Sequence, residues 1–122
     1  MDSADNGRAS APGGPAVTVA QLQDDQRFEV RVGGETAGFT AYVDAGGQRI
    51  FYHTEVGEQF AGQGLAGRLV AQALEETRQA GMHVVPVCPY VARYVGEHHD
   101  FDDIVDTVTP EALATLDRVL GS

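Results

Sequence analysis

A change of hydrophobic period at a glycine-rich loop most constrains how this chain folds. Before the loop, apolar and polar residues alternate over Gln26–Val32, Glu35–Asp44 and Gln48–Val56, which is the pattern of half-buried strands. After the loop, apolar residues recur every three or four positions over Gly64–Ala80, which is the pattern of an amphipathic helix. The chain is therefore predicted to change from sheet to helix at this loop.

Tight turns connect the three predicted strands into an antiparallel meander. Gly33-Gly34 and Ala45-Gly46-Gly47 separate the strands, and paired glycines favour short hairpin turns. Gly81 is expected to end the helix, and a valine-rich strand follows over Met82–Val87. Because a strand, a helix and a strand form a crossover, this last strand should run parallel to the third.

Two more helices complete the predicted fold, at Pro89–Glu97 and at Thr109–Leu120, where Thr109 is the expected N-cap. The fold class is α+β: a three-strand antiparallel meander, then a βαβ crossover, giving a mixed twisted sheet with flanking helices. Residues 1–16 are rich in Gly, Pro and Ala and are predicted to form a disordered tail. Residues 17–107 are predicted to form the domain, with a C-terminal helix over 108–122 packed on it.

The charge balance excludes several classes of partner and chemistry. The chain has 18 acidic residues against 8 basic ones, all arginine, for a formal net charge of −10. Nucleic acid and anionic membranes bind basic faces, so neither is an expected partner. The absence of lysine excludes Schiff-base chemistry and a P-loop. A single cysteine, Cys88, and no apolar run long enough for a signal peptide or membrane span favour a cytoplasmic location.

The loop Gln59–Gly67 is the most informative motif in the chain. Gly62 and Gly64 allow a sharp turn and a close approach of a ligand to the backbone. The free amides of the following helical turn, with the positive end of the helix dipole, form an anion site, and Arg68 adds charge. The alternative is that the glycines only make a tight connection. The position of the loop, between a meander and a long helix, favours the anion site.

The pattern Gln59-x-x-Gly62-x-Gly64 resembles the pyrophosphate-binding signature of the GNAT acetyltransferase superfamily. Together with His53–Val56, Val85–Tyr90 and Tyr94, it makes the chain similar to the minimal YjdJ-type branch, over about Arg27–Val105. This resemblance implies acetyl-coenzyme A as the cosubstrate and an unidentified amine, on a small molecule or a protein, as the acceptor. No strand pattern follows Pro89–Glu97, where larger relatives build part of the acceptor pocket.

The resemblance also implies which residues bind the cosubstrate. Those at the pyrophosphate would be Gln59, Phe60, Ala61, Gly62, Gln63, Gly64, Leu65, Ala66, Gly67 and Arg68. Those whose backbone pairs with the pantetheine arm would be His53, Thr54, Glu55 and Val56.

Three side chains are candidates for the chemistry. Cys88 precedes a predicted helix, whose dipole favours the thiolate, and the resemblance implies that this cysteine faces the thioester. His53, as a neutral imidazole, would take a proton from Cys88 or from the amine. Its strand is expected to neighbour that of Cys88, which would bring the two side chains within reach. Glu55 is an alternative base. By resemblance to larger relatives, Tyr94 would protonate the leaving thiolate. For each, a structural role is the alternative: a buried thiol, a polar residue on a sheet face, a core tyrosine.

The acidic run Glu97–Asp106 either attracts a cationic amine or is simply solvated, and its His98-His99 pair lacks metal-ligand spacing.

Two functions follow from these observations. The first is an acetyl-coenzyme A-dependent N-acetyltransferase that acts through Cys88 or by direct transfer. The second is a non-catalytic module that binds acyl-coenzyme A or coenzyme A.

Overall fold

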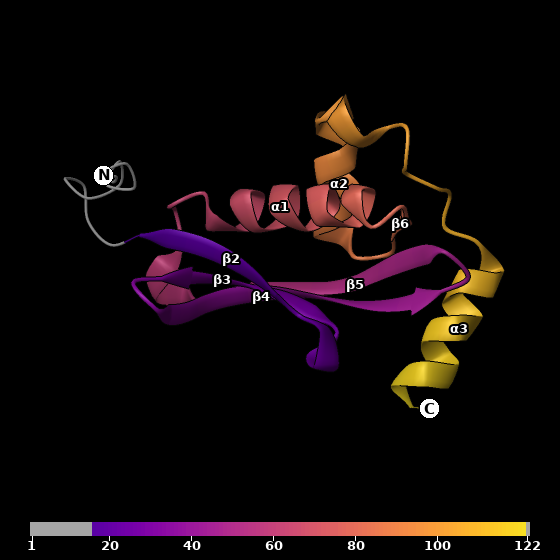
Figure 1. Ribbon diagram of the computed structural model, residues 1–122, viewed down its shortest axis with the longest axis horizontal. Helices are drawn as coiled ribbons and strands as arrows, with labels where there is room; N and C mark the ends of the chain where they lie inside the picture. Colours follow the sequence, from indigo (N-terminus) through magenta and orange to yellow (C-terminus); the bar gives the residue numbers. More distant parts are fainter. Residues whose placement is uncertain (1–15, 122) are drawn as a thin grey trace.

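A five-stranded mixed sheet forms the centre of the computed structural model, which describes residues 16–121 (Figure 1). The strands lie side by side in chain order: β2 (Val17–Leu22), β3 (Arg27–Val32), β4 (Glu35–Ala45), β5 (Gln48–Val56) and β6 (His83–Pro86). The first four are antiparallel, and β6 is parallel to β5. The predicted tail lies outside the described residues except for Ala16, whose carbonyl accepts a hydrogen bond from the Gly33 N–H at 2.8 Å.

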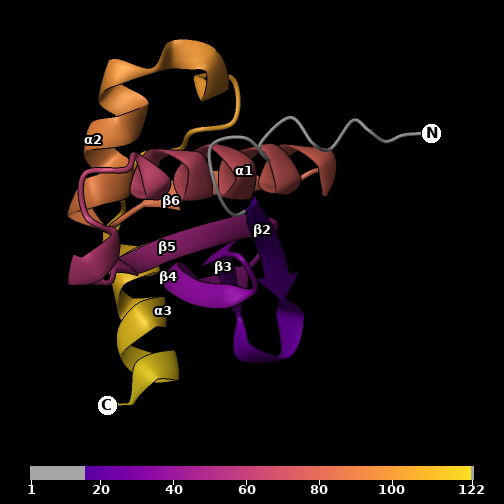
Figure 2. The ribbon, with the colours of Figure 1, turned by 90° about the vertical axis from the view of Figure 1, so that its left-hand side faces the viewer.

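Helices lie on both faces of the sheet. They are α1 (Leu65–Gln79), α2 (Pro89–Glu97) and α3 (Pro110–Leu120), with 3-10 turns η2 (Gln23–Asp25), η3 (Glu58–Phe60) and η4 (His99–Phe101). Figures 1 and 2 show α1 and α2 on one face and α3 on the other. Gly81 ends α1 as predicted, with a φ of 75° and its N–H bonded to the Arg78 carbonyl. The α+β fold with its βαβ crossover is confirmed.

The sheet has one antiparallel strand more than the predicted meander. β2 pairs with the whole of β3, from Val17↔Val32 to Leu22↔Arg27. The sequence of β2 alternates weakly, and none of its residues is fully buried, because β2 lies at the edge of the sheet. A strand that buries little apolar surface leaves little periodic signal. The three predicted strands are present as β3, β4 and β5, and β2 is an additional strand that the sequence did not predict.

A β-bulge in β5 changes which of its residues face the helices. Ala41 pairs with His53, but the next residue of β4 pairs with Phe51, so Tyr52 is the extra residue. Strict alternation from Phe51 would place His53 on the same face. Because of the bulge, Thr54 takes that place instead, and His53 is directed to the opposite face.

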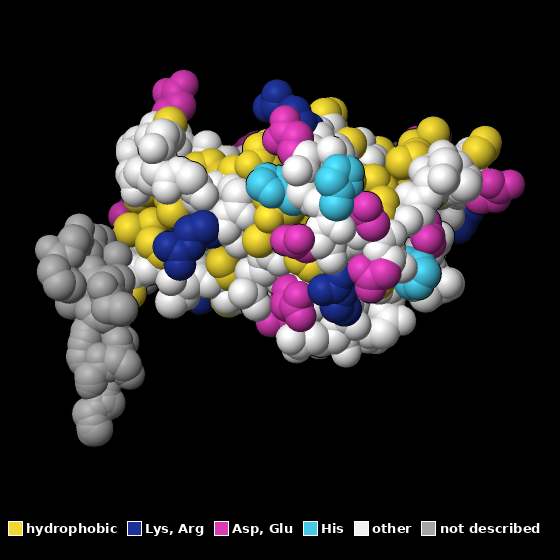
Figure 3. All heavy atoms as spheres, turned by 90° about the horizontal axis from the view of Figure 1, so that it is seen from above, with side chains coloured by type: hydrophobic (Ala, Val, Ile, Leu, Met, Phe, Trp, Pro, Cys, Tyr) yellow, Lys and Arg dark blue, Asp and Glu magenta, His cyan; other side chains and the backbone are white. Residues whose placement is uncertain are grey.

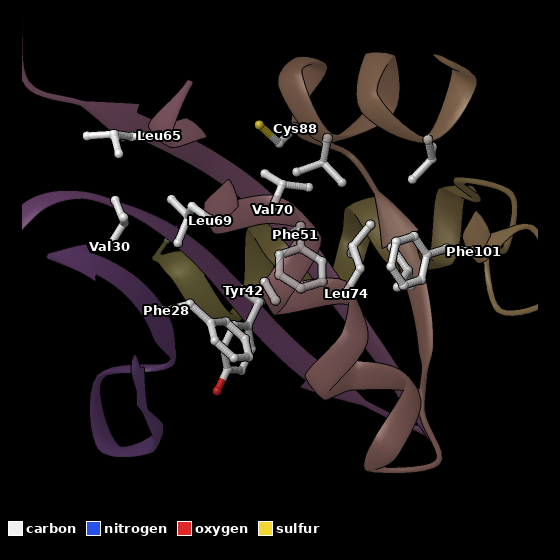
Figure 4. Packing of buried hydrophobic residues seen from close by; sticks show 14 of the residues in the cluster. Phe28, Val30, Tyr42, Phe51, Leu65, Leu69, Val70, Leu74, Cys88 and Phe101 are labelled. Carbon is white, nitrogen blue, oxygen red and sulfur yellow. The ribbon is translucent and has the colours of Figure 1, made fainter. Parts of the chain in front are cut away.

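The main core lies between the sheet and the α1–α2 layer. The aromatic rings of Phe28, Tyr42 and Phe51 have centroids 5.5–6.5 Å apart, and the apolar stripe of α1, including Leu69 and Leu74, covers them (Figure 4). Buried aromatic pairs of this kind contribute beyond the area they bury. This core fixes β5, α1 and α2 relative to one another.

A smaller cluster joins α3 to the other face. Its buried members are Val43, Ile50, Val85, Ala112 and Leu116. The helix begins where predicted, because the Thr109 hydroxyl accepts a hydrogen bond from the Ala112 N–H at 3.1 Å.

The segment between α2 and α3 passes from one face to the other along β6. Val84 forms an isolated parallel bridge with Val105. The carboxylate of Asp106 accepts hydrogen bonds from His83 Nδ1 at 2.9 Å and from Gln48 Nε2 at 2.7 Å. These bonds, chiefly the one from His83, lower the pKa of Asp106.

Candidate functional site

The glycine loop ends at the start of α1. Gly62 and Gly64 have φ values of 82° and 72°, in the left-handed region that favours glycine. Gly64 is the N-cap and offers no side chain, so the first amides of α1, those of Leu65, Ala66 and Gly67, have no capping partner. These amides and the helix dipole favour an anion at this end of α1.

Residues just before the loop and at its start position it against the core. The Gly57 N–H donates a hydrogen bond to the Ala37 carbonyl at 2.8 Å, and the half-buried ring of Phe60 packs against the main core. Gln59 is exposed beside Gly57, and Arg68 is exposed in the first turn of α1. Phe60 therefore anchors the loop, whereas Gln59 and Arg68 face solvent.

The sheet opens beside the second half of β5. The β5–β6 ladder runs from Gln48↔His83 to Phe51↔Pro86 and stops there. From Tyr52 to Val56, β5 keeps β4 on one side, and within residues 16–121 no strand pairs with its other side. The backbone groups on this free edge are placed to pair with an extended ligand. The segment predicted to bind pantetheine, His53–Val56, lies here.

Cys88 lies where the two strands separate. It is the N-cap of α2, and its N–H donates to the Phe51 carbonyl at 2.8 Å. Its side chain is buried, and its Sγ–H donates to the Thr54 hydroxyl at 3.4 Å, within the sulfur range. Thr54 in turn shares a 2.9 Å hydrogen bond with Thr40, which is fully buried. Figure 4 shows Cys88 at the border of the core, with its sulfur turned away from the ring of Phe51.

The predicted contact between His53 and Cys88 is not found. His53 Nε2 pairs with Glu55 Oε2 at 3.2 Å, and its ring lies 5.7 Å from that of Phe39 on the opposite face of the sheet. More than half of the His53 side chain is exposed. The bulge at Tyr52 is the physical reason, because it places Thr54 on the side of Cys88. The structure therefore brings together a thiol and a hydroxyl, not a thiol and an imidazole.

Tyr94 lies in a pocket between α1 and α2. This α1–α2 pocket has a volume of about 200 Å³ and is lined by Gly67, Tyr90, Arg93, Tyr94, Glu97 and His98. The Tyr94 ring stacks on that of His98 at 4.3 Å. Burial is the largest cause of the raised pKa of Tyr94, followed by Asp100 and Tyr90, so the phenol stays protonated at neutral pH. A protonated phenol can donate a proton to a thiolate.

Tyr90 is a site residue that the sequence reasoning did not assign. A Cβ built on Gly67 would lie 3.8 Å from the Tyr90 hydroxyl, so that hydroxyl faces the first turn of α1. The signal was present, since Tyr90 and Tyr94 are one helical turn apart and share a face of α2. For Thr54, the sequence predicted only a backbone contact with pantetheine. The bulge that turns its side chain toward Cys88 has no pattern in the sequence, so the side-chain contact was not predicted.

Side-chain charge on the α1–α2 face is mixed. Figure 3 shows separate basic groups on this face, one beside apolar side chains toward one end and others beside acidic side chains. An anion held here would depend chiefly on backbone amides. Among residues 16–121, no three His, Cys, Asp or Glu side chains converge on a metal site, and no helix is long and apolar enough to cross a membrane.

Comparison with known proteins identifies relatives of this fold. A sequence profile of the GCN5-related N-acetyltransferase family matches residues 27–104. The solution structure of a GCN5-like protein of Staphylococcus aureus, proposed to be an N-acetyltransferase, is similar with a TM-score of 0.59. The likeness covers 76% of this chain and 91% of that one at 15% sequence identity, which is a likeness of fold. No curated protein matches the sequence significantly.

Proposed function

Because the chain belongs to the GCN5-related N-acetyltransferase family, we propose that it transfers the acetyl group of acetyl-coenzyme A to an amine. The observation that carries the proposal is the opening between β5 and β6, beyond Phe51↔Pro86, with Cys88 where the strands part. The pantetheine arm pairs with the free edge at His53–Val56. The pyrophosphate binds the loop Gln59–Gly67 and the neighbouring Arg68, chiefly through the amides at the start of α1.

Direct transfer is the simplest reaction for this arrangement. The neutral amine attacks the thioester carbonyl, a carbon–nitrogen bond forms, and the carbon–sulfur bond breaks. Coenzyme A leaves as a thiolate, and the amine loses its extra proton to solvent. Tyr94 lies in the α1–α2 pocket beside the first turn of α1, and its phenol supplies the proton for the thiolate.

Transfer through Cys88 is the covalent form of the same reaction. The sulfur of Cys88 attacks the thioester, its proton passes to the departing coenzyme A sulfur, and an acetyl-cysteine remains. The amine then attacks that acetyl group and restores the thiol. The Thr54 hydroxyl, 3.4 Å from the sulfur, orients Cys88 in this route. His53 takes no part, because its ring is on the other face of the sheet. This route requires a reduced thiol, which is the state that the cytoplasm maintains. A cysteine at this position also agrees with the resemblance to the YjdJ-type branch.

Binding without transfer is the second candidate function. No strand follows β6 within residues 16–121, where larger acetyltransferases place part of the acceptor pocket, and this favours it. The burial of Cys88, with 4% of its surface exposed, argues only against the covalent route. In this case the same edge and loop hold acyl-coenzyme A and present it to a partner.

Intact mass measurement after incubation with acetyl-coenzyme A tests the proposal. The covalent route gives an acetyl adduct that is lost in Cys88→Ser and kept in Thr54→Ser, which retains the hydroxyl. Acetylation of an amine at an undiminished rate by Cys88→Ser would establish direct transfer. If the chain binds acetyl-coenzyme A but acetylates no amine, the result supports the non-catalytic binding module. Failure to bind coenzyme A in calorimetry would refute both functions.

A further inference from the structure

A second hollow lies on the opposite face of the sheet from the α1–α2 pocket. This α3–β5 pocket has a volume of about 550 Å³ and is lined by Tyr52, Leu113, Leu116, Asp117, Leu120 and Gly121. Figures 1 and 2 show α3 diverging from the sheet toward its C-terminal end. The volume is within the range of pockets that hold small molecules.

The pocket adjoins the same opening of the sheet that holds Cys88. Tyr52, its β5 residue, lies between Phe51, whose carbonyl binds the Cys88 N–H, and Thr54, whose hydroxyl binds the Cys88 sulfur. The ladder to β6 ends at Phe51, so no strand of the described chain closes the sheet beside Tyr52. The thiol and the pocket therefore lie on the two faces of one short stretch of β5, which pairs with β4 on one side and has a free edge on the other.

The walls of the pocket are apolar, with one charged group. Leu113 and Leu120 expose 47% and 51% of their surfaces, which is high for leucine. The carboxylate of Asp117 is exposed and has no ion-pair partner among residues 16–121. The C-terminal end of α3 adds the negative pole of its dipole. An apolar body that carries a positive charge complements this surface.

The helix that builds the pocket lies beyond the segment shared with the family. The family profile ends at residue 104, whereas α3 begins at Pro110. A determinant of acceptor choice on α3 is therefore an addition to the common domain.

We propose that the α3–β5 pocket binds the acceptor, and that the acceptor is a small primary amine with an apolar body. The acceptor pocket rests on the proposed function of acetyl transfer. Asp117 attracts the ammonium form, the leucines of α3 hold the apolar body, and the amine reaches the thioester past Tyr52. On transfer, the ammonium first releases one proton to solvent, and the neutral nitrogen bonds to the acetyl carbon as the carbon–sulfur bond of the thioester breaks. The nitrogen then releases a second proton to solvent, and the coenzyme A thiolate takes a proton from Tyr94. The pocket thus prefers amines to alcohols or carboxylates of equal length.

Titration of the full chain with amines tests the proposed acceptor pocket. Backbone amide NMR shifts report the binding, and each titration is run with and without coenzyme A. From ethylamine through butylamine to hexylamine, we expect affinity to rise about threefold per added methylene. Hexanol and hexanoate should bind more weakly than hexylamine. Asp117→Asn should weaken hexylamine about three- to fivefold. The control Glu111→Gln removes the same charge from α3 outside the pocket and should leave binding unchanged.

Several outcomes would overturn the proposal. They are equal affinity across the alkylamine series, equal effects of Asp117→Asn and Glu111→Gln, or shifts confined to residues away from α3. A dimer in sedimentation that Leu120→Ser dissociates would show that a second copy covers this face, and would refute the acceptor pocket. Coenzyme A binding, measured separately, should be normal in Asp117→Asn. Its absence from the unmodified protein would refute the proposed function and not the amine site.

Discussion

The face of the sheet under α1 and α2 differs from the face under α3 in how it is filled. The first buries three packed aromatic rings beneath two helices, and the Cys88–Thr54–Thr40 hydrogen bonds lie within it. The second buries five smaller side chains and leaves exposed leucines on α3 and exposed polar pairs such as His53–Glu55 on the strands. One face is therefore tightly packed around Cys88, whereas the other keeps the open surface where we propose that the acceptor binds.

The largest difference between the faces should appear in stability. Phe51→Ala removes a fully buried ring from the main core and should cost about 3–5 kcal/mol of unfolding free energy. Leu116→Ala removes a side chain at the border of the smaller cluster and should cost about 2 kcal/mol. Urea unfolding measures both. Equal losses would mean that the two faces contribute equally to stability.

Adjacent residues of β5 provide a sharper test, because they point to opposite faces. Thr54→Val removes the hydroxyl that binds Cys88 and leaves the buried Thr40 hydroxyl without this partner, so we expect a loss of about 1–2 kcal/mol. His53→Ala removes an exposed side chain and should change stability by less than about 0.5 kcal/mol.

The same two variants separate their roles at the thiol. The rate of Cys88 acetylation should fall in Thr54→Val and stay unchanged in His53→Ala. The reverse order would restore the imidazole as the base and would contradict the orientation of β5 described above.

Substitutions in the glycine loop test whether this end of the α1–α2 face binds coenzyme A, as proposed. Gly64→Ala places a side chain at a φ of 72° and should cost about 1–2 kcal/mol while weakening coenzyme A binding. Gly96→Ala is the matched control, because Gly96 lies in α2 with open space around it and alanine favours helix. The control should be neutral or slightly stabilising. If both variants bind coenzyme A with unchanged affinity in calorimetry, the loop does not hold the pyrophosphate.

The smallest expected effect concerns the link between the faces at Asp106. Its pKa is lowered in the folded chain, so its stabilisation is complete above the unfolded value near 3.8 and is lost as pH falls through the lower folded value. Amide exchange in α3 should therefore quicken below about pH 4 before that of α1 does. Asp106→Asn should remove this pH dependence. Equal quickening of both helices would show that the link does not hold α3.

Periodicity predicted most of the fold. The long amphipathic stripe of α1, the prolines that begin α2 and α3, and the glycine pairs of the hairpins each act locally, so the sequence carries their signal. The edge strand β2 was missed, because it buries little. The bulge at Tyr52 was missed because it arises from how β4 and β5 pair rather than from either strand alone.

That bulge also explains the limits of the site prediction. The loop at Gly62 and Gly64 has the backbone conformation that its sequence indicates. His53 was predicted to lie beside the Cys88 thiol, but in the structure that position is taken by Thr54, one residue further along β5. The pocket under α3 depends on contacts between segments more than 60 residues apart, from Tyr52 to Leu113 and beyond, which no local pattern encodes.

The parallel pairing of β5 with β6 has a consequence for how the chain folds. The β3–β4 and β4–β5 hairpins close over two-residue turns, whereas Phe51 meets Pro86 only across the whole of α1. Closing a longer loop costs more chain entropy, so this pairing should form after the hairpins. The contact between Cys88 and Thr54 spans the same closure. A newly synthesised chain therefore carries an unprotected thiol until its last strand docks, and oxidation during synthesis would trap it before the site exists.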